Sequence, residues 1–461
     1  MALSFRRPPG RHRRRLMAVA GLLSLVLPLV VAASGGASTR GGASGARVAA
    51  LRIFAPSPVL VRAGERVRIP VDAACSTARG SSCRPVVTLR VRRPGGDWSA
   101  VTAAGRPDLV FDLSTFSRRG PSSLLSGGSE RVSFRVTAVG PGAARALLPA
   151  RREGGSSGYF VAEDIPSLPV PVVDFGDVRD GEVALYLPWG TGPDQAGLAP
   201  GVEASTIGPS AFDVDAQGHI VLVDQLQNRV ARFDGAGLLG AWNDLHLGVR
   251  SDVALASDGS AFVASSPLDD QPLATVMRLD SNGASPPSPI GALGDIPTEI
   301  RSAGDQAYLR VLPLDAWLPV AEPGTTGSST GRPLDDGSQL LKVVGEHSVR
   351  LARLVEGEVT DPVELLFGQN VGEIALAEPD GAGGYLAVVH VWREIPTAAD
   401  QYDVIHVDAG HDVKVFAVAA EAFAETSPLS TFRLGGDGFL YQLTSAPDGL
   451  RIVRYDLGGI R

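Results

Sequence analysis

The chain has 461 residues, of which 20% are charged, and a formal net charge of −8 at pH 7. It contains only two cysteines, which excludes a small disulfide-rich scaffold. The net negative charge disfavours a nucleic-acid-binding protein, because contact with a phosphate backbone requires cations. The length leaves room for more than one domain.

Residues 1–33 have the composition of an export signal. Six arginines precede the apolar run Leu16–Ala33, and Val31-Ala32-Ala33 matches a small-residue cleavage site. Arg13-Arg14-Arg15 also fits a twin-arginine signal loosely. The run is near the lower length limit for crossing a bilayer, so an uncleaved anchor is the alternative. We expect a secreted or cell-surface protein that contacts the membrane only if this segment is retained.

Charge divides the remaining chain into two parts. Residues 34–49 are a linker of Gly, Ser and Ala with little else. Residues 50–165 hold 17 basic and 9 acidic side chains, whereas residues 166–461 hold 17 basic and 41 acidic. This asymmetry indicates a domain boundary near residue 165. Residues 166–180 are expected to form a Pro-rich, extended connector.

Residues 50–165 predict a β-sandwich. Val86–Val91 is typical of a core strand, Pro94–Trp98 of a turn that delivers an aromatic side chain, and Arg131–Ala138 of a later alternating strand. This order resembles fibronectin type III or immunoglobulin-like modules. Cys75 and Cys83, the two cysteines of an exported chain, are expected to form a disulfide.

The stretch Pro209–Asp234 predicts three short antiparallel strands. Ala211–Val214, His219–Val223 and Arg229–Phe233 are separated by polar turns, the first of which ends in Gly218. A unit of this kind cannot bury both of its faces alone, so it predicts neighbours of the same kind.

This stretch resembles a blade of the NHL-repeat β-propellers. The resemblance rests on Pro209, Val214-Asp215, Gly218, Val223-Asp224 and Asn228-Arg229. His219 stands where the family usually has Asn, and Gln225-Leu226-Gln227 replaces the small residues usual there. The resemblance implies a propeller fold.

Similar units recur along the chain. They are Asp252–Asp280, Thr298–Val311 with Gln339–Val344 as its continuation, Glu373–Val407 and Ser430–Tyr455. Ser348–Phe367 adds either outer strands or a degenerate sixth blade. Glu182–Trp189 is expected to pair with Arg451–Tyr455 and close the ring. The predicted fold is all-β: an N-terminal sandwich, then a propeller over residues 181–461 with six blades favoured and five or seven as alternatives.

The sequence assigns no catalytic residues. Its histidines are scattered and lack metal-ligand spacing, so we expect no metal and no cofactor. The Asp-rich loops Leu268–Asp270 and Pro333–Gly337 leave Ca²⁺ or another divalent ion as an alternative. Asp213, Asp215 and Asp224 are favoured as structural residues over a metal or catalytic set.

Two tryptophans are candidate ligand contacts. Trp242 and Trp317 fall in expected connections between strands, where an exposed ring can stack on a sugar or hold a peptide. Packing between blades is the alternative for both.

Two classes of function fit these patterns. The favoured one is an exported binding or scaffolding protein, whose propeller loop face engages a protein or glycan at the cell surface. The alternative is a metal-dependent hydrolase or lyase, similar to lactonases, with its site in the propeller channel. The fold alone does not decide between them.

Overall fold

The computed structural model describes residues 48–54, 59–77, 85–93, 95–104, 109–112, 130–139, 145–148, 157–201, 205–267, 273–290, 296–312, 316–320, 328–420, 422–424 and 428–460. Strands are the regular elements of this part of the chain, and no helix in it is long and apolar enough to cross a membrane. The predicted signal, Cys83 and Leu268–Asp270 lie outside these ranges, so the predictions made on them stay predictions.

The N-terminal module consists of two sheets. One has the order β1 (Val48–Phe54), β3 (Arg68–Thr77), β6 (Leu109–Asp112). The other has the order β2 (Leu60–Arg62), β9 (Ser157–Ala162), β7 (Glu130–Val139), β4 (Val86–Arg92), β5 (Ser99–Ala104), with β8 (Arg145–Leu148) also paired to β7.

Both sheets of the module contribute to one apolar core. Ile69 and Phe111 of the first sheet pack in the same cluster as Leu89 and Phe134 of the second. Cys75 lies on β3 and is 8% exposed. The immunoglobulin-like assignment and the Cys75–Cys83 bridge stay predictions.

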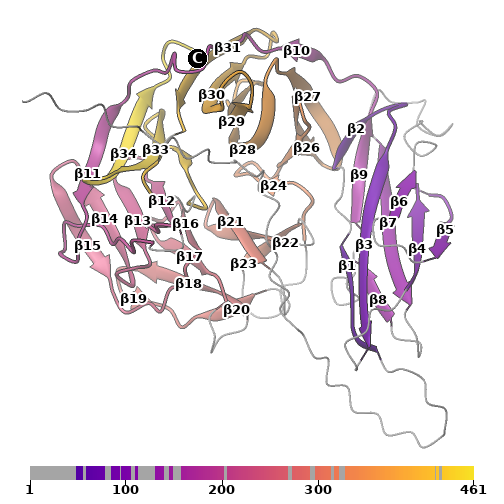
Figure 1. Cartoon of the computed structure of the whole chain (residues 1–461), viewed down its shortest axis with the longest axis horizontal. Coiled ribbons are helices and arrows are strands. Elements are labelled where there is room, and N and C mark those ends of the chain that lie inside the picture. Colours follow the sequence, from indigo (N-terminus) through magenta and orange to yellow (C-terminus); the bar gives the residue numbers. More distant parts are fainter. Residues whose placement is uncertain are drawn as a thin grey trace, which may run out of the picture.

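The rest of the chain forms a ring of six sheets, a six-bladed β-propeller (Figure 1). Blade 1 consists of β12 (Ala211–Val214), β13 (Ile220–Asp224), β14 (Arg229–Asp234) and β15 (Gly237–Trp242). Blade 2 consists of β16 (Ser251–Leu255), β17 (Ala261–Ser265), β18 (Ala274–Asp280), β19 (Gly283–Ala284) and β20 (Ser288–Ile290). Blade 3 consists of β21 (Ile296–Ala303), β22 (Gln306–Leu312) and β23 (Ala316–Val320).

Blades 4 to 6 complete the ring. Blade 4 consists of β24 (Arg332–Pro333), β25 (Gln339–Val344), β26 (Ser348–Val355) and β27 (Glu358–Leu366). Blade 5 consists of β28 (Asn370–Pro379), β29 (Tyr385–Arg393), β30 (Ala399–Val407) and β31 (Val413–Ala419). Blade 6 consists of β32 (Phe432–Leu434), β33 (Phe439–Ala446) and β34 (Gly449–Asp456). In central strands such as β13, the run Ile220–Val223 is apolar because both faces pack against neighbouring blades.

The predicted closure of the ring is confirmed. β11 (Glu182–Pro188) pairs with β34 as the outermost strand of blade 6, with Tyr186 opposite Arg451. β11, the first strand of the ring, is thereby hydrogen-bonded to β34, the last, so the outer edge of β34 is paired.

The predicted membership of one strand was wrong, and one strand was not predicted. β25 does not continue blade 3 but pairs with β26 of blade 4, and β23 is the third strand of blade 3. Ser348–Phe367 therefore belongs to a full blade. The inner strand β24 has only two residues, Arg332 and Pro333, which gave no strand pattern to mark where this blade begins.

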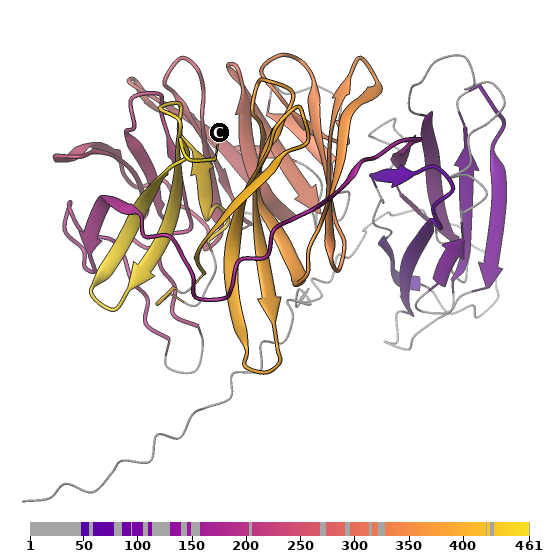
Figure 2. The same cartoon turned by 90° about the horizontal axis from the view of Figure 1, so that it is seen from above.

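The connector runs along the outside of the propeller (Figure 2). Its strand β10 (Ser167–Pro169) pairs in parallel with β27 of blade 4, and Val178 forms a bridge with Ala417 of blade 5. The connector is extended, as predicted, and it is also bonded to the propeller along its length.

The N-terminal module is docked on blade 4 through apolar and charged contacts. Leu60 and Phe160 pack in one cluster with Leu341 and Ala352. Around this cluster, Arg350 donates to Glu65 at 2.6 Å and to Glu364 at 2.8 Å, and Arg62 donates to Glu364 at 2.9 Å. Because Arg350 bonds carboxylates on both sides of the contact, it fixes the orientation of the module.

Replacing Arg350 with Ala is expected to lower the free energy of unfolding by about 2 kcal/mol, since partly buried carboxylates lose charged hydrogen bonds. Arg353→Ala on the same strand is the control, because the Asp336 partner of Arg353 is largely exposed and such pairs contribute under ~1 kcal/mol. Urea denaturation measures both variants. Equal losses would contradict a special role for Arg350.

Candidate functional site

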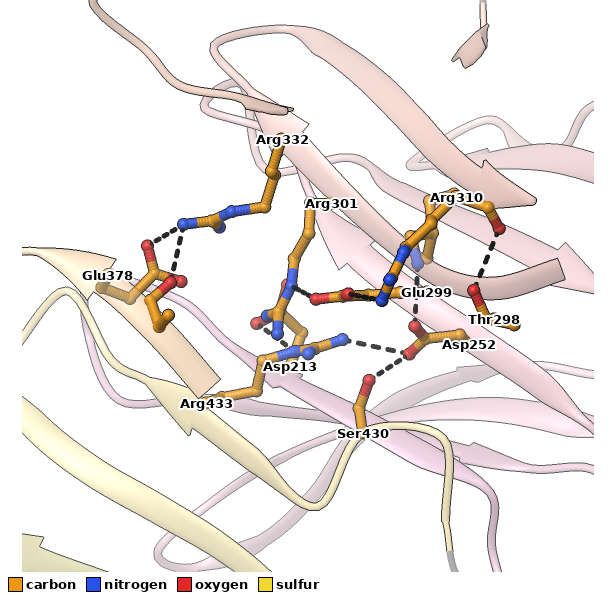
Figure 3. A network of polar contacts seen from close by, with 12 residues as sticks. Asp213, Asp252, Thr298, Glu299, Arg301, Arg310, Arg332, Glu378, Ser430 and Arg433 are labelled. Carbon is orange, nitrogen blue, oxygen red and sulfur yellow. Dashed lines mark hydrogen bonds and ion pairs between the residues drawn. The ribbon is translucent and has the colours of Figure 1, made fainter. Parts of the chain in front are cut away.

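The innermost strands of the blades bring charged side chains to the axis of the ring (Figure 3). β12, β16, β21, β24, β28 and β32 supply this set, with β22 and β25 adding one cation each: Asp213, Asp252, Glu299, Arg301, Arg310, Arg332, Lys342, Glu378 and Arg433. The set holds both signs of charge in one place.

Arg433 lies at the centre of this set and is 1% exposed. Its Nη2 donates to Asp252 Oδ1 and to the Val253 carbonyl, both at 3.0 Å. Its Nε lies 3.4 Å from Asp213 Oδ1. This guanidinium of blade 6 therefore contacts both blade 1 and blade 2.

Asp213 and Asp252 each connect their own blade to the next one in the ring. Asp213 Oδ2 accepts a hydrogen bond from the Leu255 amide of blade 2 at 2.8 Å. Asp252 Oδ2 accepts one from the Ile300 amide of blade 3 at 2.9 Å. Each carboxylate thus caps a backbone donor on the inner strand of the next blade, which leaves that donor satisfied.

Glu299 organises the next part of the axis. It accepts from Arg301 Nε at 2.8 Å and from Lys342 Nζ of blade 4 at 3.2 Å, with Arg310 at 3.9 Å. Burial would raise the pKa of Glu299, but Lys342, Arg301 and Arg310 together hold it well below its usual value. Farther on, Arg332 of blade 4 bonds Glu378 and the Ala377 carbonyl of blade 5.

Burial shifts the pKa values of both Asp213 and Arg433 toward their uncharged forms. Burial raises the pKa of Asp213, although Arg433 opposes the shift. Burial and then repulsion from Arg301 lower the pKa of Arg433. The Nη1 of Arg433 is buried without a hydrogen-bond partner in the described chain.

The carboxylates singled out in the first blade have structural partners. Asp215 accepts from the amides of Gln217 and His219, both at 2.9 Å, and holds its turn. Asp224 accepts from the Gly197 amide at 3.1 Å and lies 3.5 Å from Arg229. With Asp213 bonded toward blade 2, the three do not converge on one point.

The candidate ligand contacts Trp242 and Trp317 are both packed. Trp242 donates from Nε1 to the Asp280 carbonyl at 3.0 Å and lies against the core between blades 1 and 2. Trp317 is 3% exposed on β23, and its backbone pairs with Ser329. Packing between blades accounts for Trp242, and a ligand contact at either position stays a prediction.

The histidines of blade 5 are separated by the strand register. His390 lies opposite Tyr402, and His406 lies opposite Leu386. Each pairs with its own aspartate: Nε2 of His390 with Asp400 at 3.2 Å and Nε2 of His406 with Asp380 at 3.0 Å. Within the described ranges no group of three His, Cys, Asp or Glu side chains is arranged to hold a metal ion.

The charged axis was missed by sequence reasoning for a specific reason. Arg433 stands between Phe432 and Leu434 in a three-residue strand, and a charged residue in that pattern indicates a solvent-facing position. A signal was present at Lys342, because it is one of only two lysines in the chain and lies in an apolar run.

Comparison with known proteins supplies no family. No family model matches the chain, and no curated protein matches it. Similar solved structures include virginiamycin B lyase from Staphylococcus aureus (7% identity, 53% of this chain and 94% of that chain, TM-score 0.34). Others are the soluble aldose sugar dehydrogenase from Escherichia coli (12%, 54% and 96%, 0.32) and a gluconolactonase from Xanthomonas campestris (14%, 61% and 91%, 0.24). The propeller assignment rests on the sheet order, and the NHL-repeat resemblance stays a prediction.

A buried carboxyl away from the axis, Asp403, lies between blades 4 and 5. Asp403 is fully buried on β30; its Oδ1 accepts from Gln401 Nε2 at 2.9 Å, and its Oδ2 has no partner in the described chain. Burial raises the pKa of Asp403 to about 6. The folded state therefore loses stability as pH rises from about 4, where the unfolded side chain ionises, to about 6.

Replacing Asp403 with Asn is expected to raise the free energy of unfolding at pH 7.5 by about 2 kcal/mol and to change it little at pH 4. Asp400→Asn on the same strand is the control of opposite sign, because its bond to His390 lowers the pKa of Asp400. Urea denaturation at both pH values measures the effect. A loss of stability in Asp403→Asn at pH 7.5 would contradict it.

Proposed function

We propose that the protein is an exported binding or scaffolding protein, whose propeller loop face engages a protein partner at the cell surface. The observation that carries this proposal is a groove of about 280 Å³ between blades 4 and 5, lined by the connector residues 172–175, the β27–β28 connection and the end of β29.

Large apolar side chains at the groove are exposed to solvent. Ile395 is 83% exposed and Val172 is 63% exposed, with Trp392 lining the groove beside them. Exposed aliphatic side chains beside an aromatic are typical of a surface that another protein covers, more than of one that binds a glycan.

The walls of the groove are held in place. Arg393 lies over the Phe175 ring at 4.6 Å, and Gln401 and Gln369 donate to the Val173 carbonyl at 3.3 and 3.4 Å. These contacts tie the connector to blade 5. A groove that is already formed costs little conformational entropy when a partner enters it.

The alternative is a hydrolase or lyase with its site in the channel, the class of protein to which several of the similar solved structures belong. The observation that favours it is Asp213, a carboxyl with a raised pKa beside a buried guanidinium, since such pairs serve in acid–base chemistry. Against it, the channel carboxylates are already bonded to cations and backbone amides of neighbouring blades.

A photo-crosslinking amino acid at position 395 is expected to capture one dominant protein from the producing cell. The same group at position 239, which replaces the 51% exposed Leu239 on blade 1, is the control and should capture none. Trp392→Ala should reduce capture at 395 at least fivefold while leaving the melting temperature unchanged.

Equal capture at positions 395 and 239 would contradict the proposal. A stoichiometric divalent ion in the purified protein, whose removal lowers the melting temperature, would favour the alternative instead.

A further inference from the structure

The outer face of the second N-terminal sheet carries arginines that form no ion pair within the described residues. In β4, Val87, Leu89 and Val91 point into the core, so the alternating residues Arg90 and Arg92 point away from it. In β7 the same alternation buries Val132, Phe134 and Val136 and turns Arg135 outward. Two neighbouring strands therefore present cations on one flat surface.

The strand register opposes like charges on this face. Arg90 lies directly opposite Arg135. Arg92 and Arg135 both lie with the guanidinium carbon 4.9 Å from the centroid of the Trp98 ring. In the described part of the chain, Arg90, Arg92 and Arg135 form no ion pair with a carboxylate. Like charges directly opposite each other destabilise a sheet, so an external anion bound between the arginines would stabilise this arrangement.

A row of hydroxyl groups lies beside the arginines. Thr88 is opposite Thr137 on one side and opposite Thr102 on the other, with the Thr88 and Thr102 hydroxyl oxygens 3.1 Å apart. These residues share the outward face with Arg90. The face thus offers guanidinium groups for anions and hydroxyls for polar groups next to them.

The face is continuous with the docking contact on the propeller. On β9 the outward residue Phe160 is covered by blade 4, and Arg131 of β7 lies over its ring at 5.9 Å. Farther along this face, Arg90 and Arg92 are exposed. Both arginines belong to a region with 17 basic and 9 acidic residues, attached to a strongly acidic propeller region.

We propose that the face formed by Arg90, Arg92, Arg135 and the threonines beside them binds an acidic polysaccharide through its carboxylate groups. A guanidinium matches a planar carboxylate with two parallel hydrogen bonds, and threonine hydroxyls suit sugar hydroxyls. A polysaccharide with one carboxylate on each sugar needs few cations in contact, whereas duplex nucleic acid presents a charge every ~1.7 Å and requires many. This surface is separate from the propeller groove.

The test uses the purified full chain and sodium polygalacturonate, with titration calorimetry at 50 mM and 200 mM NaCl. Binding is expected at 50 mM NaCl and is expected to weaken at 200 mM, because surface charges are screened. Arg90→Gln/Arg135→Gln should weaken binding at least tenfold. Arg250→Gln, which removes an exposed arginine of the propeller, should change it less than twofold.

The melting temperature separates lost binding from lost folding. Arg90→Gln should be at least as stable as the parent protein, because it removes the repulsion between Arg90 and Arg135. Neutral dextran, which offers hydroxyls without carboxylates, should not bind.

Any of four results would overturn the proposal. These are no binding of polygalacturonate at 50 mM NaCl, unchanged binding by the double variant, equal binding of dextran, or tighter binding of a DNA duplex at equal charge concentration.

Discussion

The propeller depends on one buried guanidinium. Arg433 of the last blade donates to Asp252 of blade 2 and lies beside Asp213 of blade 1, with almost no exposure to solvent. A buried ion pair contributes to stability only when its remaining hydrogen bonds are satisfied. The two aspartates meet this condition by capping backbone amides of the next blades, whereas Nη1 of Arg433 has no hydrogen-bond partner within the described residues. The charged groups at the axis therefore hold neighbouring blades together through these contacts.

This arrangement places the available recognition surfaces at the periphery. The connector joins the rims of blades 4 and 5 and forms one wall of the apolar groove, while Arg350 holds the N-terminal module on blade 4. The module in turn exposes Arg90 and Arg92 on its basic sheet face. A rigid body with an apolar groove on one part and a cationic face on another is suited to bind two chemically different partners.

The sequence was most informative where local pattern and tertiary contacts agree. The repeated strands of Pro209–Asp234 and the closing strand Glu182–Trp189 were predicted because short apolar runs and tight turns are local properties. The boundary between blades 3 and 4 was not, since β24 is too short to leave a pattern. Arg433 and Glu299 were missed because their partners come from other blades, and no local signal shows which charges meet at the axis. The groove was missed for the same reason: Val172 and Ile395 are 223 positions apart in the chain.

The most direct test of the central claim is the stability of Arg433→Met, measured by urea denaturation at pH 7 beside Arg433→Met/Asp252→Asn. If the guanidinium fastens the ring, the single variant loses about 3–5 kcal/mol, because Asp252 is left buried with an uncompensated charge. The double variant then regains part of this loss. A single variant as stable as the parent protein, or a double variant that loses the sum of both effects, would contradict the account.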